Sequence, residues 1–243
     1  MAHAGSQERV GIICQPDHPV MSAVGVRLAD HGLDVAFFDP DSSIGSTELA
    51  GLSILVCKRT RPASIRALIA AQRLGVSTWN SATGVQACLT RFTQQCALAA
   101  VGFPVPNSSR TRPDGDYVAK GLYHWQSTLE VNGEGDVYEE LLPTDPIDFK
   151  YYVVDDGTTA RTRVVRVTSK LWGEKRVLGW AEPVSELVDR ITTLMDRLEM
   201  RGIGVDVIRV DGVWYAVDLN PCPDFTGAGM DAVIARSIEA CLD

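Results

Sequence analysis

The stretch "VDVIRVDGVWYAVDLN", residues 205–220, decides the fold that we expect for this chain. Two apolar runs are joined there by the Asp-Gly pair at 211–212, and such a pair between apolar runs predicts a β-hairpin. Because side chains alternate along a strand, Asp218 and Asn220 share one face of the second run. Counting back from the turn places Asp206, in the first run, beside Asp218 in one register of the hairpin.

The oxygen atoms on this hairpin are ligands that Mg²⁺ prefers when it also holds nucleotide phosphates. The carboxylates of Asp206 and Asp218 would converge there with the amide oxygen of Asn220. The alternative is that Asp218 and Asn220 only make turn hydrogen bonds before Pro221. We predict a metal site because a second carboxylate lies across the hairpin and a Pro-Cys-Pro segment follows it.

The bulk composition is that of a globular protein with one large domain or two small ones. The chain has 243 residues, 45% of them hydrophobic, and a formal net charge of −8. An acidic chain lacks the basic surface of a nucleic-acid-binding protein, although a locally basic pocket for an anionic small substrate stays open. We therefore expect no nucleic-acid partner.

Compartment and redox state are predicted from what the sequence lacks. The start "MAHAGSQERV" has no apolar core of a secretory signal, and no run approaches the roughly 18 apolar residues of a membrane span. The six cysteines form no CxxC pair, so we expect free, mostly buried thiols rather than disulfides. These features predict a cytoplasmic protein without a membrane partner.

The first third of the chain alternates strands and helices. Strands are predicted at 9–14, 33–39, 52–58 and 76–80, and helices at 19–31 and 61–75. This order indicates a small parallel sheet with helices on its faces. The turn after "VGIIC" reads "QPDHP" instead of GxGxxG, so the shape is Rossmann-like without the dinucleotide signature.

The rest of the chain has a different texture. A helix is predicted over 81–101, followed by a meander of strands and two further helices. The strand-like segments are 116–120, 136–142, 149–156 and 159–169, and the helices are 185–200 and the terminal 229–242. We therefore expect an α/β (α+β) protein with a Rossmann-like domain over 1–80 and a second domain over 81–243.

The order of several weak motifs resembles the ATP-grasp superfamily. These are "GFPVP" (102–106), "YVAK" (117–120), "YEELLPTDPIDFKYYVV" (138–154) and the hairpin with its "DLNPCP" end. The similarity is to ligases that join amino acids to peptide or protein carboxylates, and it extends from about residue 9 to 240. It implies an ATP-grasp fold with antiparallel sheets over 81–243, whose nucleotide cleft lies between subdomains 81–142 and 143–243.

The resemblance implies which residues would bind ATP. Lys120 would contact the phosphates, together with Arg91, which stands where the family usually has lysine. Asp148 would hold the ribose, and the adenine hinge would consist of Glu139 with Glu140, Leu141 and Leu142. By themselves, Lys120 reads equally as a surface cation at a strand end, and the two glutamates as alternating surface charge.

The resemblance also implies a reaction centre. Lys150 in "DFK" and Arg176 in "GEKR" would face the transferring phosphoryl group and the intermediate. Asp206, Asp218 and Asn220 would bind one or two Mg²⁺, with Mn²⁺ as a substitute. The four histidines, including His124, have no obvious partners, and no GxSxG, HExxH or P-loop motif offers another chemistry.

Three departures from the family pattern keep alternatives open. The glycine-rich loop after the strand lysine is reduced to Gly121, Gly133 and Gly135, the chain is short, and Asp218 replaces the commoner glutamate. The last feature is shared with inositol-phosphate kinases of the superfamily.

The predicted function is an ATP- and Mg²⁺-dependent ligase that activates a carboxylate as an acyl phosphate and joins it to an amine or similar nucleophile. Its partners would be ATP and a small-molecule or peptide carboxylate, and a homodimer is compatible with the resemblance. The alternatives are a phosphotransferase onto a hydroxyl and an ATP-binding protein that has lost catalysis.

Overall fold

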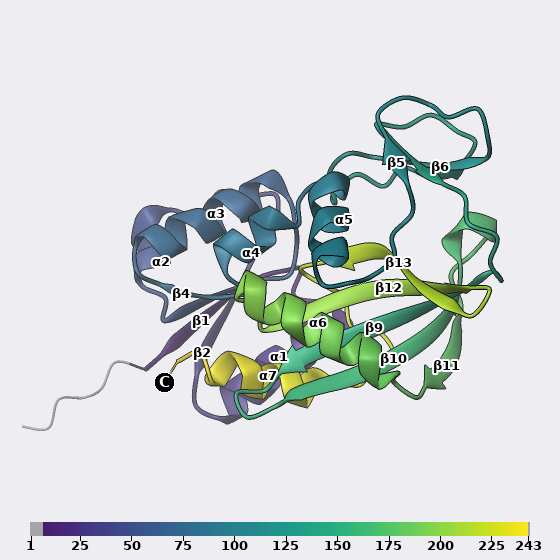
Figure 1. Cartoon of the computed structure of the whole chain (residues 1–243). Coiled ribbons are helices and arrows are strands. Elements are labelled where there is room, and N and C mark those ends of the chain that lie inside the picture. Colours follow the sequence, from purple (N-terminus) through teal and green to yellow (C-terminus); the bar gives the residue numbers. More distant parts are fainter. Residues whose placement is uncertain (1–6, 243) are drawn as a thin grey trace, which may run out of the picture.

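The computed structural model describes residues 7–242 and contains one parallel and two antiparallel sheets (Figure 1). The parallel sheet has the order β2–β1–β3–β4. Its strands are β1 (Arg9–Ile13), β2 (Asp34–Phe38), β3 (Ile54–Cys57) and β4 (Ser77–Trp79). The connecting helices are α1 (Pro19–Asp30), α2 (Ser46–Ala50) and α3 (Pro62–Arg73). The predicted Rossmann-like arrangement is confirmed, and α2 is an element that the sequence pattern did not indicate.

A five-stranded antiparallel sheet of order β11–β10–β9–β12–β13 forms the base of the second part. Its strands are β9 (Ile147–Asp155), β10 (Ala160–Thr168), β11 (Val177–Ala181), β12 (Gly202–Val210) and β13 (Val213–Asn220). The short 3₁₀ helix η1 (Lys170–Trp172) lies between β10 and β11, and α6 (Ser185–Leu198) precedes β12. The Asp-Gly hairpin at 211–212 is confirmed, because β12 and β13 pair directly across it.

A smaller antiparallel sheet has the order β5–β8–β6–β7 and lies apart from the larger one (Figure 1). Its strands are β5 (Ser108–Ser109), β6 (Tyr117–Lys120), β7 (Leu129–Val131) and β8 (Val137–Glu140). The sequence pattern predicted β6 and β8 but neither β5 nor β7. Both missed strands are short and partly or fully exposed, so they carry no apolar run that would reveal them.

The single helix predicted over 81–101 is wrong: the chain forms α4 (Ala82–Ala87) and then α5 (Arg91–Ala100). The apolar period continues through the break, but Thr90 begins a new helix. Its side-chain oxygen accepts a hydrogen bond from the Thr93 N–H at 3.2 Å, and the Thr93 hydroxyl accepts one from the Thr90 N–H at 3.3 Å. This capping box satisfies N–H groups that a continuous helix would have bonded internally.

Two hydrophobic clusters hold the parts together. One contains Leu55 of the parallel sheet with Ile191 of α6 and Val205 of β12, and the other contains Val24 of α1 with Ile234 of α7. The terminal helix α7 (Asp231–Glu239) therefore packs beside α1, at the opposite end of the chain (Figure 1). Both clusters combine residues from before and after residue 80, so the division at that position stays a prediction.

Two further observations concern thiols and membranes. The six cysteines are free, and Cys14, Cys57, Cys88 and Cys222 are buried. Within residues 7–242, every helix is too short or too polar to cross a bilayer.

Candidate active site

One cavity of about 550 Å³ lies between the two antiparallel sheets. Strands β6 and β8 line one side, and β9, β10, β12 and β13 line the other. Eleven of the twelve sequence-predicted site residues line it. They are Arg91, Lys120, Glu139, Glu140, Leu141, Leu142, Asp148, Lys150, Asp206, Asp218 and Asn220.

The β12–β13 hairpin supplies the oxygen ligands. Asp206 pairs directly with Asp218, and Gly204 pairs with Asn220, so the predicted register is confirmed. The pairing shifts between Asp206 and Val207, which marks a bulge beside the two carboxylates. Bulges re-aim side chains, and this one lies where both carboxylates face the cavity.

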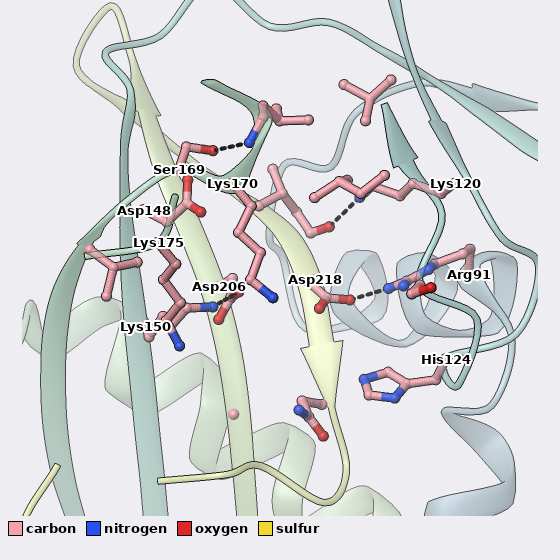
Figure 2. A pocket seen from close by; sticks show the side chains of 18 of the residues that line it. Arg91, Lys120, His124, Asp148, Lys150, Ser169, Lys170, Lys175, Asp206 and Asp218 are labelled. Carbon is pink, nitrogen blue, oxygen red and sulfur yellow. Dashed lines mark hydrogen bonds and ion pairs between the residues drawn. The ribbon is translucent and has the colours of Figure 1, made fainter. Parts of the chain in front are cut away.

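Each carboxylate of the hairpin pairs with a cation from another element (Figure 2). The Lys150 ammonium on β9 contacts Asp206, and the Arg91 guanidinium at the start of α5 contacts Asp218. Burial alone would raise the pKa of Asp218, but the neighbouring cations, Arg91 first, outweigh it and hold that pKa well below its ordinary value. Asp218 is therefore a permanent anion in the working pH range.

Lys150 experiences the same balance with the opposite charge. Burial would lower the pKa of its ammonium, but the Asp206 carboxylate more than compensates, and the net pKa is raised. The Lys150 ammonium and the Asp218 carboxylate are thus both held in their charged forms in a partly buried cleft.

These residues fit a hard divalent cation, although they contain only two carboxylates. Within residues 7–242, no group of three or more His, Cys, Asp or Glu side chains could hold a metal ion. The third ligand would be the amide oxygen of Asn220, which also accepts the Cys222 N–H at 2.9 Å and keeps a second lone pair. Mg²⁺ binds through few carboxylates and takes its other oxygens from water and phosphates, so this donor set suits it.

On the opposite wall, Lys120 forms a buried ion pair. Its ammonium lies 2.6 Å from Glu139 of β8 and donates to the Val217 carbonyl of β13 at 2.9 Å. The side chains of Lys120 and Glu139 are only 8% and 4% exposed. The lysine therefore points into the cleft and is not the surface cation that its position at a strand end allowed.

The predicted adenine hinge follows β8. The N–H groups of Glu140 and Leu141 donate to the carbonyls of Asn107 and Asp116, at 2.8 and 3.2 Å. Leu142 packs against Ile208 of β12, in a small apolar cluster that spans the two sheets. This end of the cavity is therefore apolar, and the Glu140 and Leu141 N–H groups beside it are bonded within the protein.

The cations near the hairpin differ from the prediction at one position. Arg176 does not line the cavity; its side chain is 76% exposed and faces Glu174 at 3.7 Å. Lys170 and Lys175, the residue before Arg176, line the cavity instead, near Lys150 (Figure 2). Lys175 and Arg176 of the "GEKR" motif lie in the loop before β11, and the path of that loop turns Lys175 toward the cavity and leaves Arg176 exposed.

Asp148 of β9 lines the cavity close to these lysines and Asp206 (Figure 2). Burial, aided by the Asp206 charge, raises its pKa above the ordinary value.

Sequence reasoning missed His124, which the fold places in the cavity (Figure 2). The ring Nδ1 of His124 lies 3.1 Å from the Thr60 hydroxyl, and the backbone N–H of His124 donates to the Leu89 carbonyl at 2.9 Å. Burial lowers the pKa of the ring, so the neutral imidazole is favoured. No local motif could reveal this residue, because its partners come from segments 35 and 64 residues away.

Backbone hydrogen bonds also hold the segment that follows Lys120, where the glycine-rich loop of the family would lie. The Arg91 N–H donates to the Leu122 carbonyl at 2.9 Å, so the segment after Lys120 is tied to the start of α5. This segment is held at both Leu122 and His124, and it lines the cavity from there through Leu129.

Comparison with known proteins shows the fold. No protein-family model and no curated protein sequence matches the chain. Among solved structures, ATP-grasp ligase PsnB with a minimal precursor superimposes with a TM-score of 0.72 at 18% identity, covering 98% of this chain and 99% of that one.

Two other structures give similar agreement. The macrocyclase MdnC of Microcystis aeruginosa, bound to its precursor peptide, has a TM-score of 0.70 at 11% identity, covering 96% and 99% of the chains. A RimK-domain ATP-grasp protein of Sphaerobacter thermophilus has 0.71 at 12%, covering 96% and 98%. The chain therefore has the ATP-grasp fold over nearly its whole length.

Proposed function

We propose that this protein is an ATP- and Mg²⁺-dependent ligase that activates a carboxylate as an acyl phosphate and joins it to an amine or similar nucleophile. One observation carries the proposal: an apolar hinge, a buried lysine and a pair of facing carboxylates line one cavity of an ATP-grasp fold. Each of these parts serves one portion of a bound Mg²⁺–ATP.

The nucleotide would lie along the cavity with its adenine at 139–142 and its phosphates toward the hairpin. Lys120 and Arg91 would neutralise the phosphates, and Asp148 would hold the ribose. Asp206, Asp218 and Asn220 would hold the metal, which supplies charge neutralisation between the β- and γ-phosphates. A structure of PsnB contains Mg and ADP, which supports this pairing of metal and nucleotide.

In the first step, a carboxylate oxygen of the substrate attacks the γ-phosphorus and ADP leaves. In the second, the nucleophile attacks the acyl carbon and inorganic phosphate leaves. Positioning and charge neutralisation provide most of the catalysis of phosphoryl transfer, so the protein needs no covalent nucleophile. Lys150, with Lys170 and Lys175 in place of the predicted Arg176, would stabilise the charge on the transferring group.

The substrate class is part of the proposal. The solved structures of PsnB and MdnC contain precursor peptides, which supports a peptide carboxylate alongside a small-molecule one. The cavity extends past the hairpin to Lys58 and Arg59, so there is room beyond the phosphates for an acceptor. We further propose that residues 1–80 form a separate domain whose strand ends close this side.

The proposed reaction is tested by measuring phosphate release from ATP and Mg²⁺ with hydroxylamine as a general nucleophile and a panel of carboxylic acids and acidic peptides. A ligase releases phosphate and forms a hydroxamate only when acid and nucleophile are both present. A stable phosphorylated product without free phosphate would identify a kinase instead. Thermal stabilisation by ATP without turnover on any acid would identify a protein that only binds the nucleotide.

A further inference from the structure

The segment that follows β3 of the parallel sheet lines the end of the cavity that lies beyond the hairpin. Four consecutive residues after β3, Lys58 to Arg61, line the cavity there. Three of them are cations. The segment contributes no carboxylate, and Asp224, just after β13, is the acid that lines this end of the cavity with it.

The position of this segment within the sheet is significant. In the order β2–β1–β3–β4 the chain adds β2 on one side of β1 and then crosses over to add β3 and β4 on the other side. The topological switch point therefore lies between β1 and β3. In open parallel sheets, ligands bind outside the carboxyl ends of the strands at such a switch point. The Lys58 N–H donates to the Ile13 carbonyl at 3.2 Å, so Lys58 sits at the junction of the two strand ends.

Lys58 is a buried cation without an anionic partner. Lys58 is 3% exposed, and within the described part of the chain its ammonium donates to the Cys222 carbonyl alone, at 3.3 Å. No carboxylate among residues 7–242 lies within 4.0 Å of it. Burying an ammonium is costly unless an anion compensates it.

The surroundings of Lys58 do not supply that compensation. Burial and the Arg59 charge lower its pKa, and they outweigh the opposing effects of Cys222, Asp224 and Cys14. By contrast, Lys120 and Lys150 in the same cavity each have a carboxylate partner. The unpaired charge therefore distinguishes this end of the cavity from the nucleotide end.

We propose that Lys58, supported by Arg59, binds a second, non-reacting carboxylate of the acid substrate, so that the substrate is a dicarboxylic acid or carries a second acidic group. This inference rests on the proposed ligase function and specifies its substrate class. One carboxylate of the substrate reacts beside Asp206 and Asp218, and the other lies at the carboxyl end of β3. The Cys222 carbonyl lies between the two positions, because it accepts a hydrogen bond from Lys58 and stands two residues after Asn220 at the end of β13.

The test compares dicarboxylates with their own monoamides, which have the same shape and one charge fewer. Succinate, glutarate and adipate, each with its monoamide, are titrated by calorimetry into the full chain saturated with Mg²⁺ and ADP. The wild type should bind at least one dicarboxylate about tenfold or more tightly than its monoamide, the usual order of effect for a charge-assisted hydrogen bond.

Variants assign this preference to the site. Lys58→Met keeps the length of the side chain and should abolish the preference while leaving ADP affinity unchanged. Arg59 is exposed, so Arg59→Met leaves the core packing unchanged. This substitution should reduce the preference for the dicarboxylate. Arg66→Met, an exposed cation on α3 outside the cavity, should leave it intact.

Several results would overturn the inference. These are equal affinity for dicarboxylate and monoamide in the wild type, a preference that survives both Lys58→Met and Arg59→Met, or a loss of ADP affinity in Lys58→Met as large as the loss of acid affinity. Displacement of the dicarboxylate by inorganic phosphate at equal concentration would assign Lys58 to a phosphate instead.

The hydroxylamine assay separates the two proposals. Dicarboxylate binding that depends on Lys58, without hydroxamate formation on any acid, would contradict the ligase function and leave the anion site. Hydroxamate formation with equal efficiency on monocarboxylates would confirm a ligase and contradict the second carboxylate.

Discussion

At the residue scale, the cavity is organised by ion pairs that link different elements. Lys120 with Glu139, Lys150 with Asp206 and Arg91 with Asp218 each join two strands, or a strand and a helix. Removing one member of such a partly buried pair lowers the free energy of unfolding by more than the intact pair contributes to it, because the other charge stays buried without a partner. The pairs orient the side chains before a nucleotide arrives.

Asp218 is the residue whose charge matters most for the proposed metal site. Asp218→Asn keeps the shape and an acceptor for Arg91 but removes the anion, so we expect turnover to fall about 100-fold or more, as for loss of a preorganised charge at a reaction centre. The measurement is phosphate release at saturating ATP over a range of Mg²⁺ concentrations.

The control is Asp114→Asn, an exposed carboxylate outside the cavity, which should behave as the wild type. Because Asp218→Asn leaves the Arg91 guanidinium without its anion, we expect it to unfold at a lower temperature than the wild type, and turnover is compared at a temperature at which circular dichroism shows both proteins to be folded. Undiminished turnover in this variant would remove Asp218 from the metal site.

At the element scale, the start of α5 positions Arg91 through the capping box of Thr90. Thr90→Ala should lower the free energy of unfolding by about 1 kcal/mol, because the Thr93 N–H loses its capping oxygen. Urea denaturation measures this. The same substitution at Thr193, an exposed mid-helix position of α6, should have little effect or be slightly stabilising. Equal effects at the two positions would show that the cap does not stabilise α5.

The turn between β9 and β10 is held by Asp156. Its carboxylate accepts the Thr159 N–H at 3.1 Å and the Arg161 guanidinium at 3.1 Å, and it is 5% exposed. The backbone hydrogen bond from Thr159 contributes most to lowering its pKa from 3.8 to about 2.

A lowered pKa stabilises the folded state when the group is ionised, so this contribution is present above the ordinary pKa and is lost as pH falls through about 2. We expect Asp156→Asn to be less stable than the wild type at pH 7, with the difference shrinking between about pH 4 and pH 2. Thermal unfolding across that range measures it. Asp189→Asn, an exposed position on α6, is the control; a difference for Asp156→Asn that does not change with pH would contradict the assignment.

At the scale of the whole molecule, Asn80 joins the parallel sheet to the large antiparallel sheet. It is fully buried, its amide donates to the carbonyls of Gly202 and Pro221, and its oxygen accepts the N–H groups of Arg201 and Gly202. These bonds fix the start of β12 and the end of β13 against the end of β4. The geometry of the hairpin therefore depends on a residue that is far from it in sequence.

Asn80→Ala leaves four buried backbone groups without this partner, and each costs about 1–3 kcal/mol if nothing replaces it. We expect the free energy of unfolding to fall by at least about 3 kcal/mol, measured by urea denaturation. Gln72→Ala, an exposed amide on α3, should change it by less than about 0.5 kcal/mol. A small loss at Asn80 would mean that the two sheets are held together without it.

The sequence by itself determined the features that depend on local spacing. The β12–β13 hairpin, its facing Asp206 and Asp218, and the alternating strands and helices before residue 80 follow from turn chemistry and apolar periodicity. The helix break at Thr90 was missed because periodicity outweighed a capping signal only four residues long.

Only the tertiary structure decided which charges share the cavity. Lys175 rather than Arg176 lines the cavity, His124 enters the cavity from a loop, and Lys58 lies at the end of the cavity beyond the hairpin. These residues meet through contacts between segments that are widely separated in sequence, and such contacts leave no periodic pattern in any one of them. Sheet order, the packing of one sheet on another and the paths of the connecting loops fix them instead, because Lys58, His124 and Lys175 all lie outside the strands.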